Sequence, residues 1–143
     1  MKTPRLTTLS WALYDWANSA FATVVMAGFF PIFFTKYWAR HAHHTESTFY
    51  LGLGNSLASV VIAALAPVLG AVADRSSARR KFLVFFAFLG ILMTGMLWFV
   101  KEGMWPLALG LYVFAMVGFS GGNIFYNSLL SGITSEESVD FVS

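Results

Sequence analysis

The sequence predicts an all-α integral membrane protein with four transmembrane helices. Of its 143 residues, 57% are hydrophobic and only 11% are charged, and the mean hydropathy is +0.67. The hydrophobic share and the mean hydropathy are higher than in ordinary soluble domains, and the charged share is lower. All three values are typical of helical membrane proteins. The charged residues lie between long apolar stretches, and those stretches lack the alternating polarity of barrel strands.

Four uncharged stretches are long enough to cross a bilayer, which takes about 20 apolar residues. They cover residues 16–35, 47–73, 82–100 and 103–135. Allowing for their flanks, we expect transmembrane helices at about 9–35, 49–73, 82–100 and 106–130.

The first and second helices each contain a proline near one end. The first stretch is too long for the apolar core of a signal peptide, so we interpret it as a retained membrane helix. Tyr37 and Trp38 mark its outer end, because these side chains prefer the headgroup region. Pro31 and Pro67 each free a backbone carbonyl, which a membrane tolerates only where protein or a water-lined cavity receives it.

The third and fourth helices are set apart by their flanks and by small residues. The basic triplet Arg79-Arg80-Lys81 precedes the third helix, whereas the fourth carries no charge. Small residues recur at a spacing of four in Gly118-x-x-x-Gly122, and also in Ala66-x-x-x-Gly70 of the second helix. This spacing lets helix backbones approach closely. It predicts a bundle without naming the partner helix.

The basic residues predict the orientation in the membrane. Six of the nine Lys and Arg residues lie near the N-terminus or in the 74–81 loop, and the other three lie in the remaining two loops. Basic residues are enriched on the cytoplasmic side, so both termini and the 74–81 loop are expected there. We expect a multi-pass protein of the bacterial inner membrane, with the vacuolar membrane as the alternative.

Candidate functional residues lie within the first and fourth helices. A carboxylate inside a membrane segment is costly unless it faces the bundle or a cavity, which makes Asp15 a candidate for substrate contact or proton coupling. The competing interpretation is that Asp15 caps the start of its helix. Asn18 and Ser19 continue the polar line, while Asn123 and Asn127 occupy the fourth helix. Because the fourth helix runs back toward the cytoplasmic side, Asn127 is expected at about the same depth as Asn18. The two polar sets could therefore face one cavity, or could simply hydrogen-bond between helices.

The sequence predicts no cofactor, no metal site and no enzymatic activity. His41, His43 and His44 lie near Glu46, and clustered imidazoles can bind zinc or copper, but no second ligand cluster supports such a site. The chain has no cysteine. It also lacks a phosphate-binding glycine loop and the common hydrolase motifs. Its basic residues form no stripe of the kind that binds nucleic acid.

Two parts of the chain resemble known transporter motifs. Residues 70–81 resemble the signature loop between helices two and three of the major facilitator superfamily. The matching residues are Gly70, Asp74, Arg75, Arg79 and Arg80. The turn at 76–78 is one residue longer than usual and lacks its glycine. Residues 11–21 and 125–130 are similar to the vacuole-effluxer branch, which contains autophagy-related vacuolar amino-acid exporters and their bacterial relatives.

The resemblance implies a secondary transporter of small solutes that works by alternating access, with amino-acid efflux as its activity. The four helices would then be helices 1–4 of a twelve-helix fold. Asp74 and Arg75 would belong to a cytoplasmic latch that grips the opposite half of the protein and holds the outward-open state. The arginine that many proton antiporters carry in helix four is missing here, which weakens the case for proton antiport.

Because the superfamily has about twelve helices, we expect residues 1–143 to be the N-terminal part of one major facilitator domain. Its partners would be the bilayer, a small solute, and the missing C-terminal half or a second subunit. Two alternatives stay open. One is a complete four-helix dimeric exporter of the small-multidrug type, with Asp15 as its essential carboxylate. The other is a non-transporting membrane subunit that packs against or regulates a partner.

Overall fold

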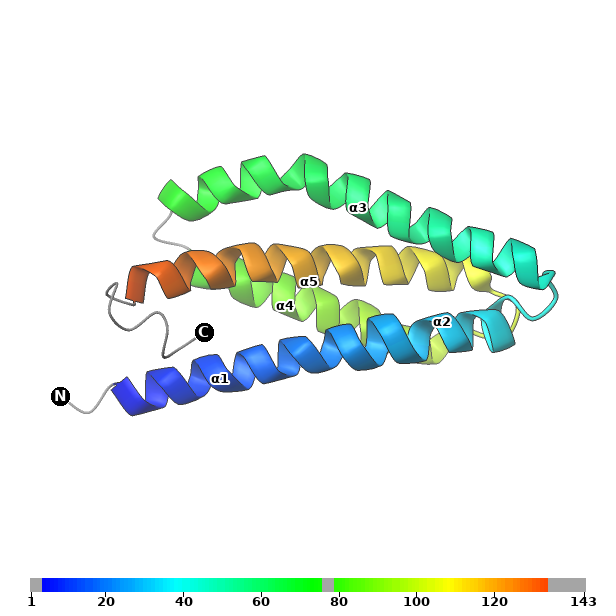
Figure 1. Cartoon of the computed structure of the whole chain (residues 1–143), viewed down its shortest axis with the longest axis horizontal. Coiled ribbons are helices and arrows are strands. Elements are labelled where there is room, and N and C mark those ends of the chain that lie inside the picture. Colours follow the sequence, from blue (N-terminus) through cyan, green and yellow to red (C-terminus); the bar gives the residue numbers. More distant parts are fainter. Residues whose placement is uncertain (1–3, 76–78, 134–143) are drawn as a thin grey trace.

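Four long helical rods lie side by side in the computed structural model, which describes residues 4–75 and 79–133 (Figure 1). The first rod comprises α1 (Pro4–Ala20), the π-helix η1 (Phe21–Phe29), α2 (Phe30–Phe33) and the π-helix η2 (Phe34–Trp38). It is followed by α3 (His44–Arg75), α4 (Arg79–Met96) with the short 3₁₀ turn η3 (Leu97–Phe99), and α5 (Trp105–Ile133).

The described residues contain four helices that are long and apolar enough to cross a membrane, and no strand. These spans are Leu9–Trp38, His44–Asp74, Arg79–Phe99 and Trp105–Leu129. The all-α membrane fold predicted from the uncharged stretches is therefore confirmed. The helices extend past the expected ends because polar residues in the interfacial layers continue them, as Glu46 does in the first turn of α3.

Helix α5 is the central element of the bundle. It packs against α3 on one side and against α4 on another, while the first rod runs along the remaining side (Figure 1). The end of α3 and the start of α4 lie at the same end of the bundle as the start of α1 and the last described turn of α5. The other two connections, 39–43 and 100–104, lie together at the opposite end, which we call the loop end.

The first rod accommodates Pro31 by widening its helical turns. Just before the proline, the Phe30 N–H donates to the carbonyl of Val25, five residues earlier. Beyond it, the Thr35 hydroxyl donates to the carbonyls of Pro31 at 3.0 Å and Ile32 at 3.1 Å. Serine, threonine and local π-geometry commonly satisfy backbone groups around a membrane proline. Helix α3, by contrast, stays helical through Pro67 and is bowed in Figure 1.

An aromatic cluster fastens the first rod to α5 near the loop end. Phe30 and Phe34 are fully buried, and the ring of Phe30 stacks on Tyr112 with centroids 3.9 Å apart. The indole N–H of Trp38 donates to the carbonyl of Val100 at 3.1 Å, which also ties in the chain after α4. Stacked aromatic pairs contribute about 0.5–1.5 kcal/mol beyond their area burial. This cluster therefore holds the loop end together.

The backbones of α4 and α5 approach each other closely. A Cβ atom added at Gly118 would lie 2.6 Å from the backbone nitrogen of Gly90, so only glycine fits there. One turn later, a Cβ at Gly122 would lie 2.9 Å from the Tyr14 hydroxyl. The structure thus names α4 as the main partner of the Gly118-x-x-x-Gly122 face. Gly70 is different, because a Cβ added there would meet nothing within 4 Å.

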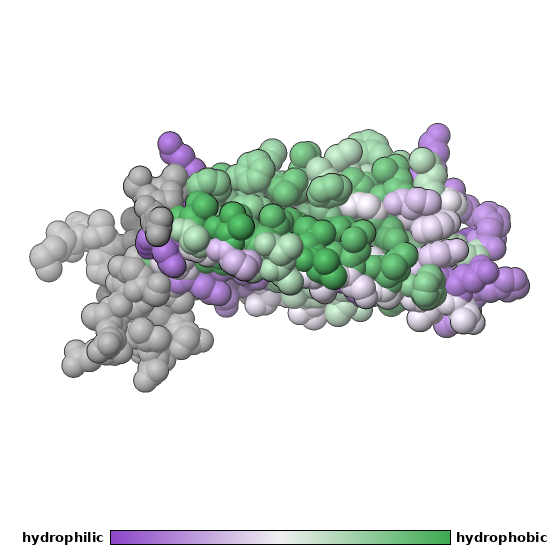
Figure 2. Space-filling model, turned by 90° about the horizontal axis from the view of Figure 1, so that it is seen from above, coloured by the Kyte–Doolittle hydropathy of each residue, from purple (hydrophilic) through white to green (hydrophobic). Residues whose placement is uncertain are grey.

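The outward surface of the bundle is largely apolar. On the face seen in Figure 2, hydrophobic residues cover the middle and hydrophilic residues gather toward the ends. Large exposed side chains include Val60, Phe88 and Ile91, each more than half exposed. Such a continuous apolar surface suits a lipid bilayer.

We expect Gly118→Ala to destabilise the bundle by about 1–3 kcal/mol, because the added methyl group forces two closely packed helices apart. Gly110→Ala is the matched control: this glycine lies on the same helix, and its Cβ would meet nothing within 4 Å. Chemical unfolding in detergent micelles measures both variants. Equal stability of the two would contradict the proposed role of the α4–α5 contact.

Candidate functional site

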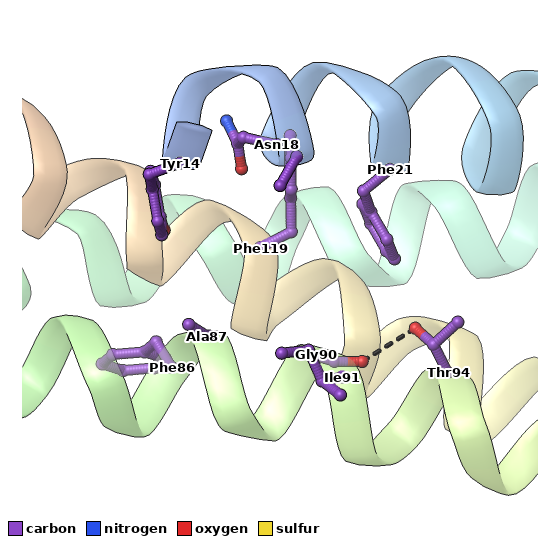
Figure 3. A pocket seen from close by; sticks show the side chains of 10 residues that line it. Tyr14, Asn18, Phe21, Phe86, Ala87, Gly90, Ile91, Thr94 and Phe119 are labelled. Carbon is purple, nitrogen blue, oxygen red and sulfur yellow. Dashed lines mark hydrogen bonds between the residues drawn. The ribbon is translucent and has the colours of Figure 1, made fainter. Parts of the chain in front are cut away.

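A cavity of about 400 Å³ lies between α1, α4 and α5 (Figure 3). Its lining is mostly apolar and aromatic, with three polar side chains. The lining residues are Tyr14, Ala17, Asn18, Phe21, Phe86, Ala87, Gly90, Ile91, Thr94 and Phe119. The Thr94 hydroxyl donates to the Gly90 carbonyl at 2.7 Å. No charged side chain lines this cavity.

A side-chain hydrogen bond beside the cavity joins the two predicted polar sets. The amide nitrogen of Asn18 donates to the side-chain oxygen of Asn123 at 2.7 Å. The Asn18 oxygen and the Asn123 amide nitrogen make no other hydrogen bond within the described residues. Each is half-buried, so the pair presents one acceptor and one donor that a polar solute or water can use.

Aromatic side chains position this pair. Tyr14 stacks on Tyr126 with ring centroids 4.9 Å apart, one turn before Asn18. Phe21 stacks on Phe119 at 5.1 Å, one turn after it. Because these contacts lie on both sides of Asn18, they hold α1 and α5 in the register that brings the two amides together.

Asp15 lies beside the cavity and not in its lining. Its side chain is exposed on the outer face of α1, as is that of Ser19, and the exposed Thr23 continues this line at the same spacing of four on η1. The capping interpretation of Asp15 is wrong, because α1 begins at Pro4 and Asp15 lies about three turns inside it. Its carboxylate makes no ion pair within the described residues but lies within electrostatic range of Tyr126.

The relative depth of α1 and α5 differs from the expected one by a helical turn. We expected Asn127 to lie at the depth of Asn18, but Asn18 pairs with Asn123. Asn127 is exposed and makes no hydrogen bond within the described part of the chain. Axial shifts of this size cannot be deduced from helix boundaries alone, because tilt and loop conformation decide them.

Arg79 of the charged loop joins three helices of this same unit. Its guanidinium donates to the carbonyl of Asp74 at 3.0 Å and to the carbonyl of Ser128 at 3.3 Å. The Ser128 hydroxyl also contacts the Ala73 carbonyl at 3.5 Å. A cation near the last carbonyls of a helix stabilises its terminus. Arg79 therefore anchors the ends of α3 and α5 to the start of α4.

Two other residues of the loop, Asp74 and Arg80, differ from Arg79 in their lack of a side-chain partner within the described residues. The Asp74 carboxylate and the Arg80 side chain are exposed and form no ion pair within the described residues. Gly70 is half-buried beside open space. The side chain of Arg75, which ends α3, and the turn at 76–78 lie outside the described residues.

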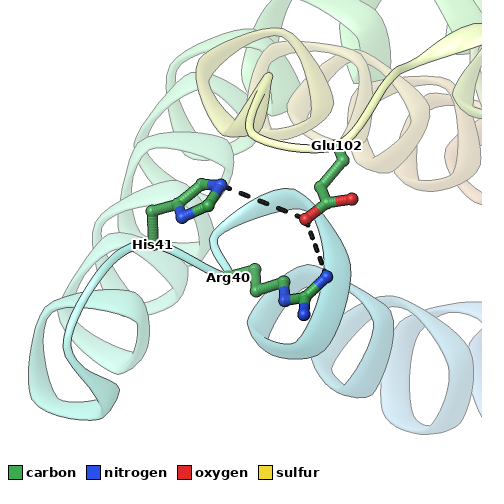
Figure 4. Close-up of polar contacts among 3 residues, drawn as sticks. All are labelled: Arg40, His41 and Glu102. Carbon is green, nitrogen blue, oxygen red and sulfur yellow. Dashed lines mark hydrogen bonds and ion pairs between the residues drawn. The ribbon is translucent and has the colours of Figure 1, made fainter.

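At the loop end, an ion pair that the sequence analysis did not anticipate joins the two connections (Figure 4). Arg40 donates to the carboxylate of Glu102 at 3.0 Å, and the Nε2 atom of His41 lies 4.0 Å from the same oxygen. The sequence did contain a signal for this ion pair, because opposite charges occur in two loops that are expected on the same side of the membrane. No group of His, Asp and Glu residues in the described chain is arranged to hold a metal ion.

Taken together, these features define a multi-pass helical membrane protein with polar groups at membrane depth. The family model described as vacuole effluxer Atg22 like matches residues 44–139. The chain therefore belongs to the vacuole effluxer Atg22-like family.

Two curated relatives match nearly the whole chain. One is the uncharacterized MFS-type transporter YxiO of Bacillus subtilis (strain 168), 39% identical over 135 residues, which cover 94% of this chain and 32% of the relative. The other is an uncharacterized protein of Aquifex aeolicus (strain VF5), 33% identical over 122 residues, covering 85% of this chain and 30% of the relative. The chain thus spans about a third of the length of these relatives. No solved structure matches it.

We expect the Asn18–Asn123 hydrogen bond to contribute about 0.6 kcal/mol to the stability of the bundle, and at most about 1.7 kcal/mol, as such bonds do in membranes. A double-mutant cycle with Asn18→Ala and Asn123→Ala measures this coupling in detergent micelles. Asn18→Ala combined with Asn127→Ala is the control and should show no coupling. Coupling in the control pair alone would support the register expected from the sequence and contradict the one described above.

Proposed function

We propose that this chain supplies four helices of a secondary active transporter that moves small solutes by alternating access. The observation that carries the proposal is its similarity, over 94% of its length, to an MFS-type transporter. Transporters of this kind rock two helical bundles around a site near the middle of the membrane. The four helices would form part of one such bundle and would not transport alone.

The exposed polar residues suggest where the solute path runs. Asp15, Ser19 and Thr23 lie along the outer face of the first rod, and Asn127 is exposed on α5. Polar side chains at membrane depth rarely face lipid, because desolvation without a partner is costly. We therefore assign this face to a water-filled path shared with the remaining helices, and not to the bilayer.

The Asn18–Asn123 pair is our candidate for direct solute contact. Its free oxygen and free amide nitrogen offer an acceptor and a donor close together. A neutral pair of this kind suits a solute with both kinds of polar group, and amino-acid efflux, which the family resemblance implied, fits that requirement. Asp15 is the candidate for a charged contact or for coupling to an ion.

We further propose that the charged loop forms one side of a latch. Asp74 and Arg80 are exposed and form no ion pair within the described residues, so they could grip another part of the transporter, together with Arg75. Arg79 is assigned a different task, because its guanidinium is already bonded to α3 and α5. It would keep the loop rigid while its neighbours engage and release.

Both ends of the chain and the charged loop are proposed to be cytoplasmic in a bacterial inner membrane. The chain has no cysteine, so single cysteines introduced at Arg80 and at Lys101 report on the two ends of the bundle. In right-side-out vesicles, we expect an impermeant maleimide to label the Lys101→Cys variant and to spare Arg80→Cys until the membrane is permeabilised. The reverse pattern would contradict this orientation.

We expect Asp15→Asn to lower transport about tenfold or more, the effect of losing one charged contact of about 1.4 kcal/mol. The test uses a chimaera in which this chain replaces the matching segment of the B. subtilis relative. Amino-acid release from preloaded vesicles is the measurement. Glu102→Gln is the control, because this exposed carboxylate lies at the loop end and pairs with Arg40.

The same assay separates the alternatives. Release by vesicles that contain this chain alone would support a complete four-helix exporter. An Asp15→Asn chimaera with full activity would exclude Asp15 from the path.

Asp74 tests the proposed latch in the same chimaera. Asp74→Asn should slow turnover without weakening solute binding, and unchanged turnover would contradict that role.

A further inference from the structure

A second cavity, of about 270 Å³, opens at the loop end, far along the bundle from the polar pair. We call it the loop-end pocket. Both short connections and the first turns of α3 and α5 contribute to it. Its lining residues are Trp38, Ala39, His41, Ala42, Glu46, Tyr50, Gly103 and Trp105.

The carboxylate in this pocket has no counter-ion. Glu46 accepts a hydrogen bond from the backbone N–H of His43 at 3.2 Å, a helix-capping contact that leaves its charge uncompensated. It forms no ion pair within the described residues. The nearby Glu102 does, because Arg40 lies 3.0 Å from its carboxylate oxygen. The pocket wall therefore carries a net negative charge at Glu46.

Aromatic rings supply the rest of the wall. Tyr50 and Trp105 stack with centroids 4.1 Å apart and planes 11° from parallel, which fixes both rings at the pocket. Trp38 is buried behind them, and its indole N–H is already bonded to the Val100 carbonyl. A carboxylate beside rigid aromatic rings is the arrangement that attracts organic cations, through charge and through cation–π contact.

We propose that the loop-end pocket binds a small organic cation, a substituted ammonium group held between the Glu46 carboxylate and the outward face of the stacked Tyr50–Trp105 pair. The ammonium charge offsets the unpaired carboxylate, while its alkyl groups contact the aromatic surface. Backbone geometry supports the pocket, since Gly103 turns the chain with φ of +80°, a conformation that other residues rarely adopt. This inference does not depend on the transport proposal.

Choline and its uncharged isostere 3,3-dimethylbutan-1-ol are suitable probes, because they share one shape and differ in charge. The whole chain in detergent micelles is labelled with 5-fluorotryptophan, and the fluorine resonances are assigned by single Trp→Phe variants. We expect choline to shift the resonances of Trp105 and Trp38 saturably, and the uncharged alcohol to leave them unchanged. Absence of a saturable choline shift, or equal shifts from both compounds, would overturn the proposal.

Glu46→Gln tests the carboxylate without removing the capping bond, because the amide oxygen can still accept from His43. We expect it to weaken choline binding about fivefold, the value of one charge contact of about 1 kcal/mol in water. Glu102→Gln is the matched control, since its carboxylate is paired with Arg40 and does not line the pocket. Equal effects of the two variants would mean that general surface charge attracts choline, which contradicts a built site.

Tyr50 tests the aromatic part. Tyr50→Leu should weaken choline binding about two- to fivefold, the usual range of an exposed cation–π contact. Tyr50→Phe keeps the ring and should bind choline as the native chain does. If both variants bind like the native chain, the aromatic contact is absent and the proposal fails.

Discussion

The close approach of α4 and α5 at Gly90 and Gly118 is the contact on which the rest of the bundle depends. It places two backbones within reach of each other along the middle of the membrane, where packing and not exclusion from water must hold helices together. With α5 fixed in this way, α3 packs against a second side of it and the first rod against a third. The cavity beside Asn18 exists because the first rod reaches α5 through large aromatic rings, whereas α4 meets it backbone to backbone.

A second constraint is the cost of polar groups in a bilayer, and the structure meets it unevenly. Within the unit, the polar groups pair: Asn18 with Asn123, and Asn55 with the Tyr112 hydroxyl, which donates to it at 3.0 Å. On the outer face of α1, Asp15 has no such partner. Some surfaces of the bundle therefore have their polar side chains hydrogen-bonded within these four helices, whereas the surface around Asp15 needs water or further protein as a hydrogen-bond partner. In the transport proposal, this face of α1 would line the path shared with further helices.

The sequence was sufficient for the fold class and the family, because both depend on local patterns. Uncharged stretches of sufficient length must be helical in lipid, and the motifs at 11–21 and 70–81 are continuous in the chain. It was insufficient wherever two helices had to be placed against each other. Asn123 and not Asn127 meets Asn18, since the axial shift between helices depends on tilt. The hydrogen bond from Arg79 to its carbonyl partner on α5 could not be predicted for the same reason, because that partner lies 49 residues away. The loop-end pocket joins residues 38–50 to residues 103–105, and a contact between two stretches so far apart in the chain has no local signal in the sequence.

The π-helical winding of the first rod has a mechanical consequence. The hydrogen bonds of a π-helix reach one residue further than those of an α-helix. If one such turn in η1 rewinds to α-geometry, the residues on either side rotate relative to each other by about 100°, the angle of one α-helical residue. The outer half is held by Phe34 and Trp38. The inner half could turn only after its contacts with α5, including the Asn18–Asn123 hydrogen bond, have broken. Asp15 would then move to a different side of the first rod, while the aromatic cluster keeps the outer half of the rod in place.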